Sequence, residues 1–274
     1  MQQPRYVVLD KVVGETPLAC LERYRAEHPE LADLSLAYAG RLDPLASGKL
    51  LVLIGDECKA QQRYHAFDKA YSVNLLVGAG TDSGDVLGLV EEDETRAAGV
   101  GYREIRATAQ SLVGPLALPY PIYSSKPVAG KPLHTWAAEG RLAEIEVPIA
   151  HTYCYRFGVT TTHLWSRDEV YAAATAKIHT FPVQPPEPTG RGNDFRRPEI
   201  LERWEQFRIA GRSADRFTVA EATLIVSSGT YVRAIVPELG RRLDTCALAL
   251  SIHRTHIGRY RKLGPLGLWH PRLS

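Results

Sequence analysis

One acidic residue stands in a loop whose other residues restrict the backbone. Residues 40–49 read Gly-Arg-Leu-Asp-Pro-Leu-Ala-Ser-Gly-Lys, so Asp43 is followed by a proline and bracketed by Gly40 and Gly48. Such a loop can hold a single carboxylate in a set orientation, where it can act as a nucleophile or as a general base. The alternative is that Asp43 is a turn residue whose side chain bonds nearby backbone N–H groups.

A second polar stretch, Gly-Ala-Gly-Thr-Asp-Ser-Gly-Asp, lies at residues 78–85. Its spacing misses the dinucleotide fingerprint G-x-G-x-x-G by one residue and no amphipathic helix follows, so we exclude a nucleotide cofactor there. Asp82 and Asp85 could form a carboxylate pair of the kind that glycosidases use. A glycine-rich hairpin between two strands is the commoner explanation of this pattern.

A third candidate is the stretch Ser-Ser-Gly-Thr-Tyr-Val-Arg at residues 227–233. It leads from a strand pattern into a helical pattern, which Thr230 can cap and which Pro237 should kink or end early. Arg233 taken alone is more often a surface residue than a residue of an active site.

Metal and hydrolase chemistry find little support in the sequence. His253 and His256 lack further ligands at metal-binding spacing, and the four cysteines lie far apart with no C-x-x-C pair. The serines show no G-x-S-x-G nucleophile elbow.

The elements that must position these residues mix helices and strands without regular alternation. Thr16, followed by a proline, predicts the start of a helix over residues 18–28, and a capping-box pattern at residues 166–169 predicts a helix toward Lys177. The proline-rich residues 181–198 are expected to form a loop. Strands are predicted at residues 6–10, 50–54, 70–77 and 217–226. We therefore expect an α+β fold with a mixed, mostly antiparallel central sheet flanked by helices.

Composition and charge exclude several classes of protein. A chain of 274 residues with 45% apolar positions can bury its own core without disulfide or metal staples. No apolar run approaches the ~20 residues of a membrane span and the first residues lack a signal pattern, so we expect a cytoplasmic protein. The net charge is only +2, yet residues 82–94 hold six acids while residues 251–274 hold five Arg or Lys and no acid. The latter pattern suits either a polyanionic partner or a solvated tail.

Taken together, these pieces resemble the TruB family of tRNA pseudouridine synthases, in family motif order over almost the whole chain. The loop with Asp43 is similar to the motif G-x-L-D-P-L-A-[ST]-G, and residues 229–233 follow G-T-Y-[IV]-R. Residues 9–16 are similar to D-K-P-x-G-x-[ST], and residues 69–88 to K-x-Y with T-D-[ST]-x-D-x-x-G. Two further stretches are similar to P-P-x-[YF]-S-A and L-R-R, at residues 120–125 and 252–254.

The resemblance implies a pseudouridine synthase fold and the isomerisation of uridine to pseudouridine in RNA, at uridine 55 in the T-loop of tRNA. It implies that Asp43 is the catalytic aspartate, that Tyr71 and Tyr231 line the uridine pocket, that Arg233 pairs with Asp43, and that Ile252 contacts the base. The reaction breaks an N-glycosidic bond and rejoins the uracil through carbon without net oxidation. Neither a redox cofactor nor a metal is therefore expected.

The reaction also explains why these residue types are needed. Burial favours a neutral aspartate, whereas a nearby guanidinium favours the charged form, so Arg233 should keep Asp43 ionised. The target base must leave its stack at a cost of a few kcal/mol, and a stacking contact with Tyr71 returns roughly 1–3 kcal/mol. Whether Asp43 attacks the anomeric carbon or removes the C2′ proton is left open.

The chain departs from the family pattern in four places. Tyr38 stands where the family has a histidine linked to opening of the RNA loop, so we expect Tyr38 to meet the substrate and base extrusion to be assisted differently. Val12 replaces a proline of the first motif, and Arg41 creates an Arg-Leu-Asp string that also resembles other pseudouridine synthase families. We expect residues 1–274 to form a single catalytic domain with an insertion at about 160–215 and no C-terminal RNA-binding domain of the type called PUA.

The expected partner is tRNA, bound by a monomer that does not associate with membranes. Basic residues should contact RNA phosphates around the pocket, and the candidates are Lys11, Lys59, Arg241, Arg242, Arg254 and Arg259. Two alternatives stay open: the same reaction on another structured RNA, and an RNA-binding or RNA-folding module that keeps the pocket without turnover. The presence of both Asp43 and Arg233 argues for the enzyme.

Overall fold

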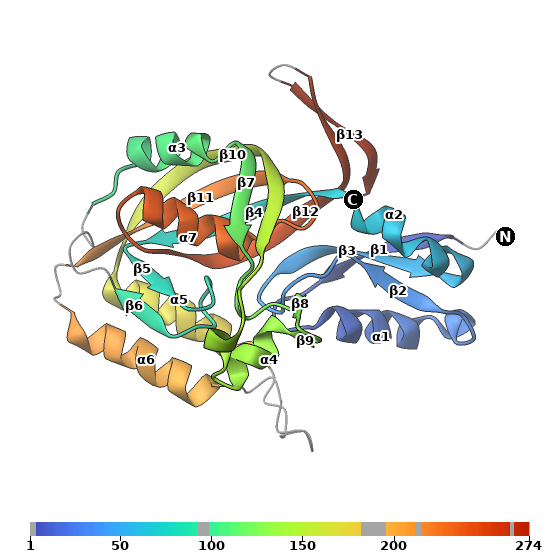
Figure 1. Cartoon of the computed structure of the whole chain (residues 1–274), viewed down its shortest axis with the longest axis horizontal. Coiled ribbons are helices and arrows are strands. Elements are labelled where there is room, and N and C mark those ends of the chain that lie inside the picture. Colours follow the sequence, from blue (N-terminus) through green and yellow to red (C-terminus); the bar gives the residue numbers. More distant parts are fainter. Residues whose placement is uncertain (1–3, 93–98, 182–195, 212–214, 264–265, 274) are drawn as a thin grey trace.

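A curved nine-stranded sheet forms the centre of the computed structural model, which describes residues 4–92, 99–181, 196–211, 215–263 and 266–273 (Figure 1). The strand order is β1-β3-β12-β4-β11-β10-β7, with β2 paired to β3 and β13 paired to β12. These strands are β1 (Tyr6–Lys11), β2 (Leu36–Ala39), β3 (Ser47–Ile54), β4 (Asp68–Val77), β7 (Gly114–Pro119), β10 (Ile149–Ser166), β11 (Arg216–Val226), β12 (Ala247–Leu263) and β13 (Leu266–Leu273). Two small ribbons pair β5 (Ala79–Thr81) with β6 (Val90–Glu92), and β8 (Pro127–Val128) with β9 (Lys131–Pro132).

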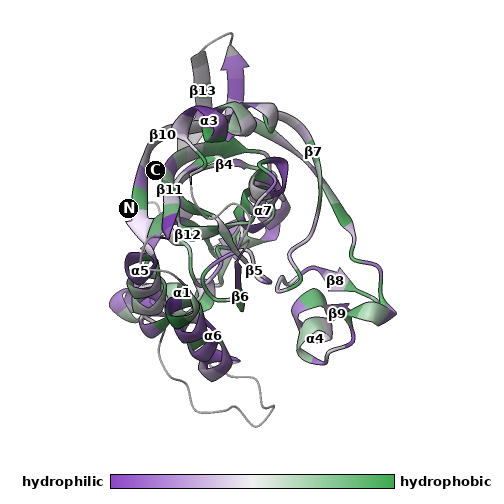
Figure 2. Ribbon diagram, turned by 90° about the vertical axis from the view of Figure 1, so that its left-hand side faces the viewer, coloured by the Kyte–Doolittle hydropathy of each residue, from purple (hydrophilic) through white to green (hydrophobic). Residues whose placement is uncertain are grey.

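Helices cover both faces of the sheet. They are α1 (Pro17–Glu27), α2 (Gln61–His65), α3 (Tyr102–Ser111), α4 (Leu133–Ala138), α5 (Arg167–His179), α6 (Arg197–Ala210) and α7 (Val232–Arg242). Helices α3 and α7 pack against one face of the sheet and form a hydrophobic cluster with it. Helices α5 and α6 pack against the opposite face and form a second cluster. In Figure 2, α7 lies within the curve of the sheet, and α5 and α6 lie outside it. In the described parts of the chain, no helix is both long and apolar enough to span a membrane.

The predicted fold class and most predicted elements are confirmed. The sheet is antiparallel throughout the described strands except for one short parallel contact, in which His253 and Arg254 pair with Ser47 and Gly48. The Thr16 hydroxyl accepts a hydrogen bond from the Ala19 N–H and caps α1. Both bonds of the predicted capping box open α5.

Three predictions of detail need correction. Thr230 does not cap α7: its hydroxyl donates to the Ser227 carbonyl at 2.8 Å, and Tyr231 occupies the cap position without a side-chain bond. Pro237 does not end α7, which continues to Arg242 because its apolar side chains are buried in the core. Of the predicted loop over residues 181–198, residues 182–195 lie outside the described residues, and Pro198 belongs to the first turn of α6, where a missing N–H costs little.

A β-bulge turns one strand toward the candidate site. Ala247 and Ala249 of β12 point into the cluster beneath α7, as strand alternation requires. The pairing of β12 with β4 then shifts between Ala249 and Ser251. Because the bulge adds one residue, Ile252 faces the same side as Ala249 instead of the opposite side.

Gly48 is required where β3 meets β12. Its φ is +100°, and a Cβ added there would lie 2.3 Å from the Arg254 carbonyl oxygen. We expect Gly48→Ala to lower the free energy of unfolding by about 2–4 kcal/mol, measured by urea denaturation. Gly55 is the matched control, because its φ is +60° but no atom lies within 4 Å of an added Cβ. Gly55→Ala should cost about 1 kcal/mol, and equal losses for the two variants would contradict the steric account.

Candidate active site

The loop that carries Asp43 is anchored on both sides of the acid. Leu42 is buried in the hydrophobic cluster beneath α7, and Leu45 is buried in the cluster on the opposite face of the sheet. A turn closes between them, with the Ala46 N–H donating to the Asp43 carbonyl at 3.0 Å. The Asp43 side chain itself is 31% exposed. The loop therefore presents one carboxylate to solvent from a fixed backbone.

Two buried cations hold the carbonyl groups of this loop. Arg254 is fully buried and donates to the carbonyls of Gly40, Arg41 and Lys49 at 3.2, 3.1 and 2.6 Å. Lys11 is 1% exposed and donates to the Pro44 carbonyl at 3.3 Å. Burial lowers the pKa of Lys11 to about 8. The prediction that Lys11 and Arg254 contact RNA phosphates was wrong, because both side chains are enclosed by the loop that they support.

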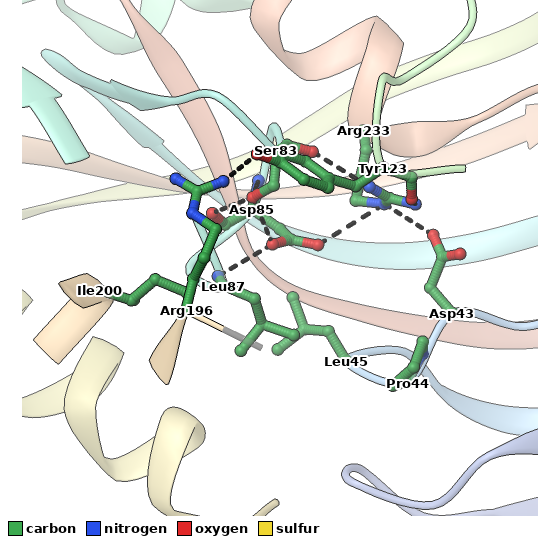
Figure 3. A pocket seen from close by; sticks show the side chains of 10 residues that line it. All are labelled: Asp43, Pro44, Leu45, Ser83, Asp85, Leu87, Tyr123, Arg196, Ile200 and Arg233. Carbon is green, nitrogen blue, oxygen red and sulfur yellow. Dashed lines mark hydrogen bonds and ion pairs between the residues drawn. The ribbon is translucent and has the colours of Figure 1, made fainter. Parts of the chain in front are cut away.

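Arg233 joins the loop to two other segments of the chain. From the first turn of α7, its Nε donates to Asp43 Oδ2 at 2.7 Å and lies 3.5 Å from Asp85 Oδ2. Its Nη1 and Nη2 donate to the carbonyls of Ser83 and Tyr123 at 3.2 and 3.3 Å (Figure 3). The predicted pairing of Asp43 with Arg233 is confirmed. The resemblance supplied this pair, which lies 190 residues apart in sequence.

Asp85 is a member of the site whose importance sequence reasoning missed. Its carboxylate is 5% exposed and also accepts hydrogen bonds from the Leu87 N–H at 2.9 Å and the Ser83 hydroxyl at 2.8 Å. Burial raises the pKa of Asp85. Burial would lower the pKa of Arg233, but the charges of Asp43 and Asp85 raise it on balance. One guanidinium thus serves two carboxylates, one buried and one facing solvent.

A cleft opens in front of Asp43, and the predicted pocket residues meet in it. Its lining includes Tyr38, Tyr71, Tyr231 and Ile252 together with Asp43. Tyr71 is 8% exposed, and burial raises the pKa of its hydroxyl. Burial likewise raises the pKa of Tyr231, so both rings are neutral at pH 7. The cleft therefore places aromatic and aliphatic surface beside one carboxylate.

The exposed cation that lines the cleft is not one of the predicted ones. Arg41 and His65 are exposed and line the cleft, and partial burial lowers the pKa of His65, so Arg41 carries the positive charge there. Lys59 is not a lining residue and is paired with Asp56 at 2.7 Å. Arg241 and Arg242 both bond Glu238 at the far end of α7. Arg41 stands two residues before Asp43 in the motif and was not among the predicted phosphate contacts.

Arg196 reaches the site from the segment that the sequence left unmatched. Its Nη2 donates to Asp82 Oδ2 at 2.7 Å, its Nη1 donates to the Tyr123 hydroxyl, and its guanidinium lies 5.1 Å from the Tyr123 ring centre. Tyr123 in turn supplies the carbonyl that accepts from Arg233. Figure 3 shows Arg196 on the side of Asp85 opposite to Asp43. No motif of the sequence marked Arg196 for this position.

We expect Arg196→Gln to lower the turnover rate about tenfold by loosening Tyr123 and, through it, Arg233. The rate would be measured at saturating substrate, where weaker substrate binding alone has no effect. Arg203→Gln is the matched control, because Arg203 is exposed on α6, the helix that follows Arg196. Equal rates for Arg196→Gln and wild type would show that the contact between Arg196 and Tyr123 does not affect turnover.

The arrangement suits chemistry by a single carboxylate. Asp43 accepts a charge-assisted hydrogen bond from Arg233 on one oxygen, and its partial exposure leaves it accessible from the cleft. In the described ranges, no group of three or more His, Cys, Asp or Glu side chains is placed to hold a metal ion.

Comparisons with known proteins place these features in a family. Residues 32–175 match the model of the N-terminal domain of the TruB family pseudouridylate synthases. The chain is 25% identical over 255 residues to tRNA pseudouridine synthase B of Lactobacillus delbrueckii subsp. bulgaricus, covering 93% of this chain and 68% of that protein. It is 27% identical over 256 residues to tRNA pseudouridine synthase B of Bordetella pertussis, covering 93% of this chain and 81% of that protein.

A solved structure shares the fold. It is a chain of the crystal structure of a Cbf5-Nop10-Gar1 complex, with a TM-score of 0.53 and 15% sequence identity. The match covers 92% of this chain and 48% of that chain, so this chain spans about half the length of the solved one.

Proposed function

The chain belongs to the TruB family of pseudouridylate synthases, and from this premise we propose that it converts uridine 55 in the T-loop of tRNA to pseudouridine, with Asp43 as the reacting carboxylate. The observation that carries the proposal is the 2.7 Å contact between Asp43 Oδ2 and Arg233 Nε, which holds a carboxylate that lines an open cleft. Two relatives named as tRNA pseudouridine synthase B match over 93% of this chain, which supports tRNA as the substrate.

The lining of the cleft supports a flipped uridine. A base that is stacked in an RNA helix cannot enter a cleft lined by Asp43, Tyr71 and Ile252, so the target nucleotide must swing out, at a cost of a few kcal/mol. Tyr71, Tyr231 and Ile252 offer stacking and apolar contact to the extruded base, which return part of that cost. The buried Ser124 hydroxyl also lines the cleft and has no hydrogen-bond partner among the described residues, so it can serve a polar edge of the uracil.

Each residue then has a part in the reaction. Arg233 holds Asp43 ionised and oriented, and Asp43 acts at the ribose as a nucleophile on C1′ or as a base at C2′. Arg254 and Lys11 hold the Asp43 loop in place through hydrogen bonds to its backbone carbonyls. Tyr38 lies at the cleft wall where it can fill the place of the extruded base, and Arg41 at the mouth can meet a phosphate.

The experiment is to incubate the purified protein with an unmodified tRNA transcript and to map pseudouridine along the RNA. We expect one modified position, uridine 55, and no product from a transcript with cytidine at that position. Product at another position, or only on another structured RNA, would support the same reaction with a different target. Binding without product on any RNA would favour a module that holds RNA without turnover.

A further inference from the structure

The hairpin formed by β12 and β13 carries a positive surface outside the cleft. It projects beyond the body of the molecule in Figure 1. Arg259, Arg261, Lys262 and His270 are exposed on it, and the sequence from residue 251 onward contains no acid. In the part of the chain that the structure describes, no carboxylate lies within the 4.0 Å of a salt bridge to Arg259 or Arg261. These charges are therefore available to a partner.

The hairpin has two different faces. Strand pairing sets Tyr260 opposite Trp269 and Arg261 opposite Leu268, and side chains alternate between the faces of a strand. Arg259 and Arg261, two residues apart on β12, thus share one face with His270 and with Leu268, which is 58% exposed. Tyr260, Lys262 and Trp269 share the other face. We call the first of these the basic face.

Aromatic packing fixes the hairpin to the sheet. The Tyr260 and Trp269 rings lie 5.3 Å apart, and Tyr155 of β10 lies 5.4 Å from Tyr260. The buried Asp68 carboxylate accepts from the Tyr260 N–H at 2.7 Å and from the Tyr155 hydroxyl at 3.3 Å. The root of the hairpin is therefore held in one orientation.

The same strand connects the hairpin to the active site. Arg254 of β12 holds the Asp43 loop, and Ile252 of β12 lines the cleft. At about 3.3 Å per residue, the strand from Arg254 to Arg261 spans about 23 Å. The basic face thus lies at a set distance from the reacting carboxylate, as a contact to a second part of one long substrate requires.

We propose that the basic face of the hairpin binds phosphates of the same tRNA, about 23 Å along β12 from the arginine that holds the Asp43 loop; this inference rests on the proposed function. Unpaired cations on an acid-free surface match a polyanion, and phosphate contacts of this kind position a nucleic acid without reading its sequence. A polyanion is favoured over a membrane or an apolar protein surface, because the exposed Leu268 lies directly opposite the charged Arg261 on this face.

The test compares Arg259→Gln/Arg261→Gln with wild type in tRNA binding at several salt concentrations. We expect the double variant to bind full-length tRNA about tenfold more weakly at low salt, and its plot of log affinity against log salt to be shallower by about 1.5, the sum of two phosphate contacts. Arg103→Gln/Arg106→Gln is the matched control, with the same charge change on exposed positions of α3. It should match wild type.

A short stem-loop with three base pairs separates this contact from the cleft. Its stem extends roughly 10 Å and cannot reach the hairpin while the loop occupies the cleft, so the double variant should bind it within twofold of wild type. Equal affinity of the double variant and wild type for full-length tRNA would overturn the inference, as would an equal loss with the stem-loop. Hairpin-dependent binding without pseudouridine would leave the inference standing and refute the proposed function.

Discussion

Replacement of Asp43 by Asn should lower the rate of pseudouridine formation at least about a hundredfold, or about 3 kcal/mol of transition-state stabilisation. Asn keeps the size of the side chain and can still bond Arg233 through its oxygen, but it is neither a nucleophile nor a base. The loop is held by Leu42, Leu45 and Arg254, so it should keep its shape. The affinity for tRNA should therefore change by less than about threefold.

The rate is measured in a single turnover at saturating tRNA, and the affinity is measured separately by fluorescence anisotropy. Asp10→Asn is the matched control, because the Asp10 side chain is 67% exposed and its one described partner is Lys49 at 3.2 Å. That variant should retain the wild-type rate. If Asp43→Asn lost affinity as much as rate, the carboxylate would be shaping the loop and not reacting.

Replacement of Arg233 by Met should be the most destabilising change in the site. Arg233 is 5% exposed, and its loss leaves the equally buried Asp85 carboxylate without its cation. Removal of one partner from a buried ion pair costs about 3–5 kcal/mol. We expect a loss of that size in urea denaturation, together with loss of activity. Arg242→Met, which breaks a surface pair with Glu238 at 2.8 Å, should cost less than about 1 kcal/mol.

A double variant separates the two consequences of losing Arg233. Arg233→Met/Asp85→Asn removes the buried carboxylate as well as its cation, so much of the stability should return. Activity should not return, because Asp43 still lacks the guanidinium that orients it. Recovery of activity along with stability would mean that Arg233 acts only through the fold. No recovery of stability would mean that Asp85 is not the source of the cost.

Local sequence signals predicted the elements better than the connections between them. Thr16 and the box at Ser166 identified two helix starts, because a cap is made by neighbours in sequence. The α+β class also followed from the pattern of strands. The capping of α7 was predicted wrongly, because Thr230 bonds a carbonyl and not the helix N–H groups.

The site was predictable only as far as the family motifs reach. They supplied Asp43, Tyr71, Tyr231 and Ile252, which the structure brings to one cleft, and Arg233, which bonds Asp43. The positions of Lys and Arg in the sequence do not show which of these side chains are buried. Lys11 and Arg254 were predicted at the phosphate rim because exposure cannot be deduced from charge, and the structure encloses both.

Contacts made by unmatched segments could not be predicted. Arg196 reaches Tyr123 and Asp82 across 73 and 114 residues of sequence, and nothing in the composition around it indicates that approach. The bulge in β12 that turns Ile252 toward the cleft could not be predicted from the sequence either, because it depends on how β12 pairs with β4. Both features are consequences of tertiary packing.

The most direct measurement follows the hydrogen on C5 of the target uracil. When the base is rejoined to the ribose through C5, that hydrogen must leave as a proton, so tRNA transcribed with tritium at C5 of its uridines reports each turnover as tritium in water. The account predicts release of one tritium per tRNA molecule by the wild-type protein and none above background by Asp43→Asn. Release by Asp43→Asn at the wild-type rate would contradict the claim that this carboxylate reacts with the flipped nucleoside.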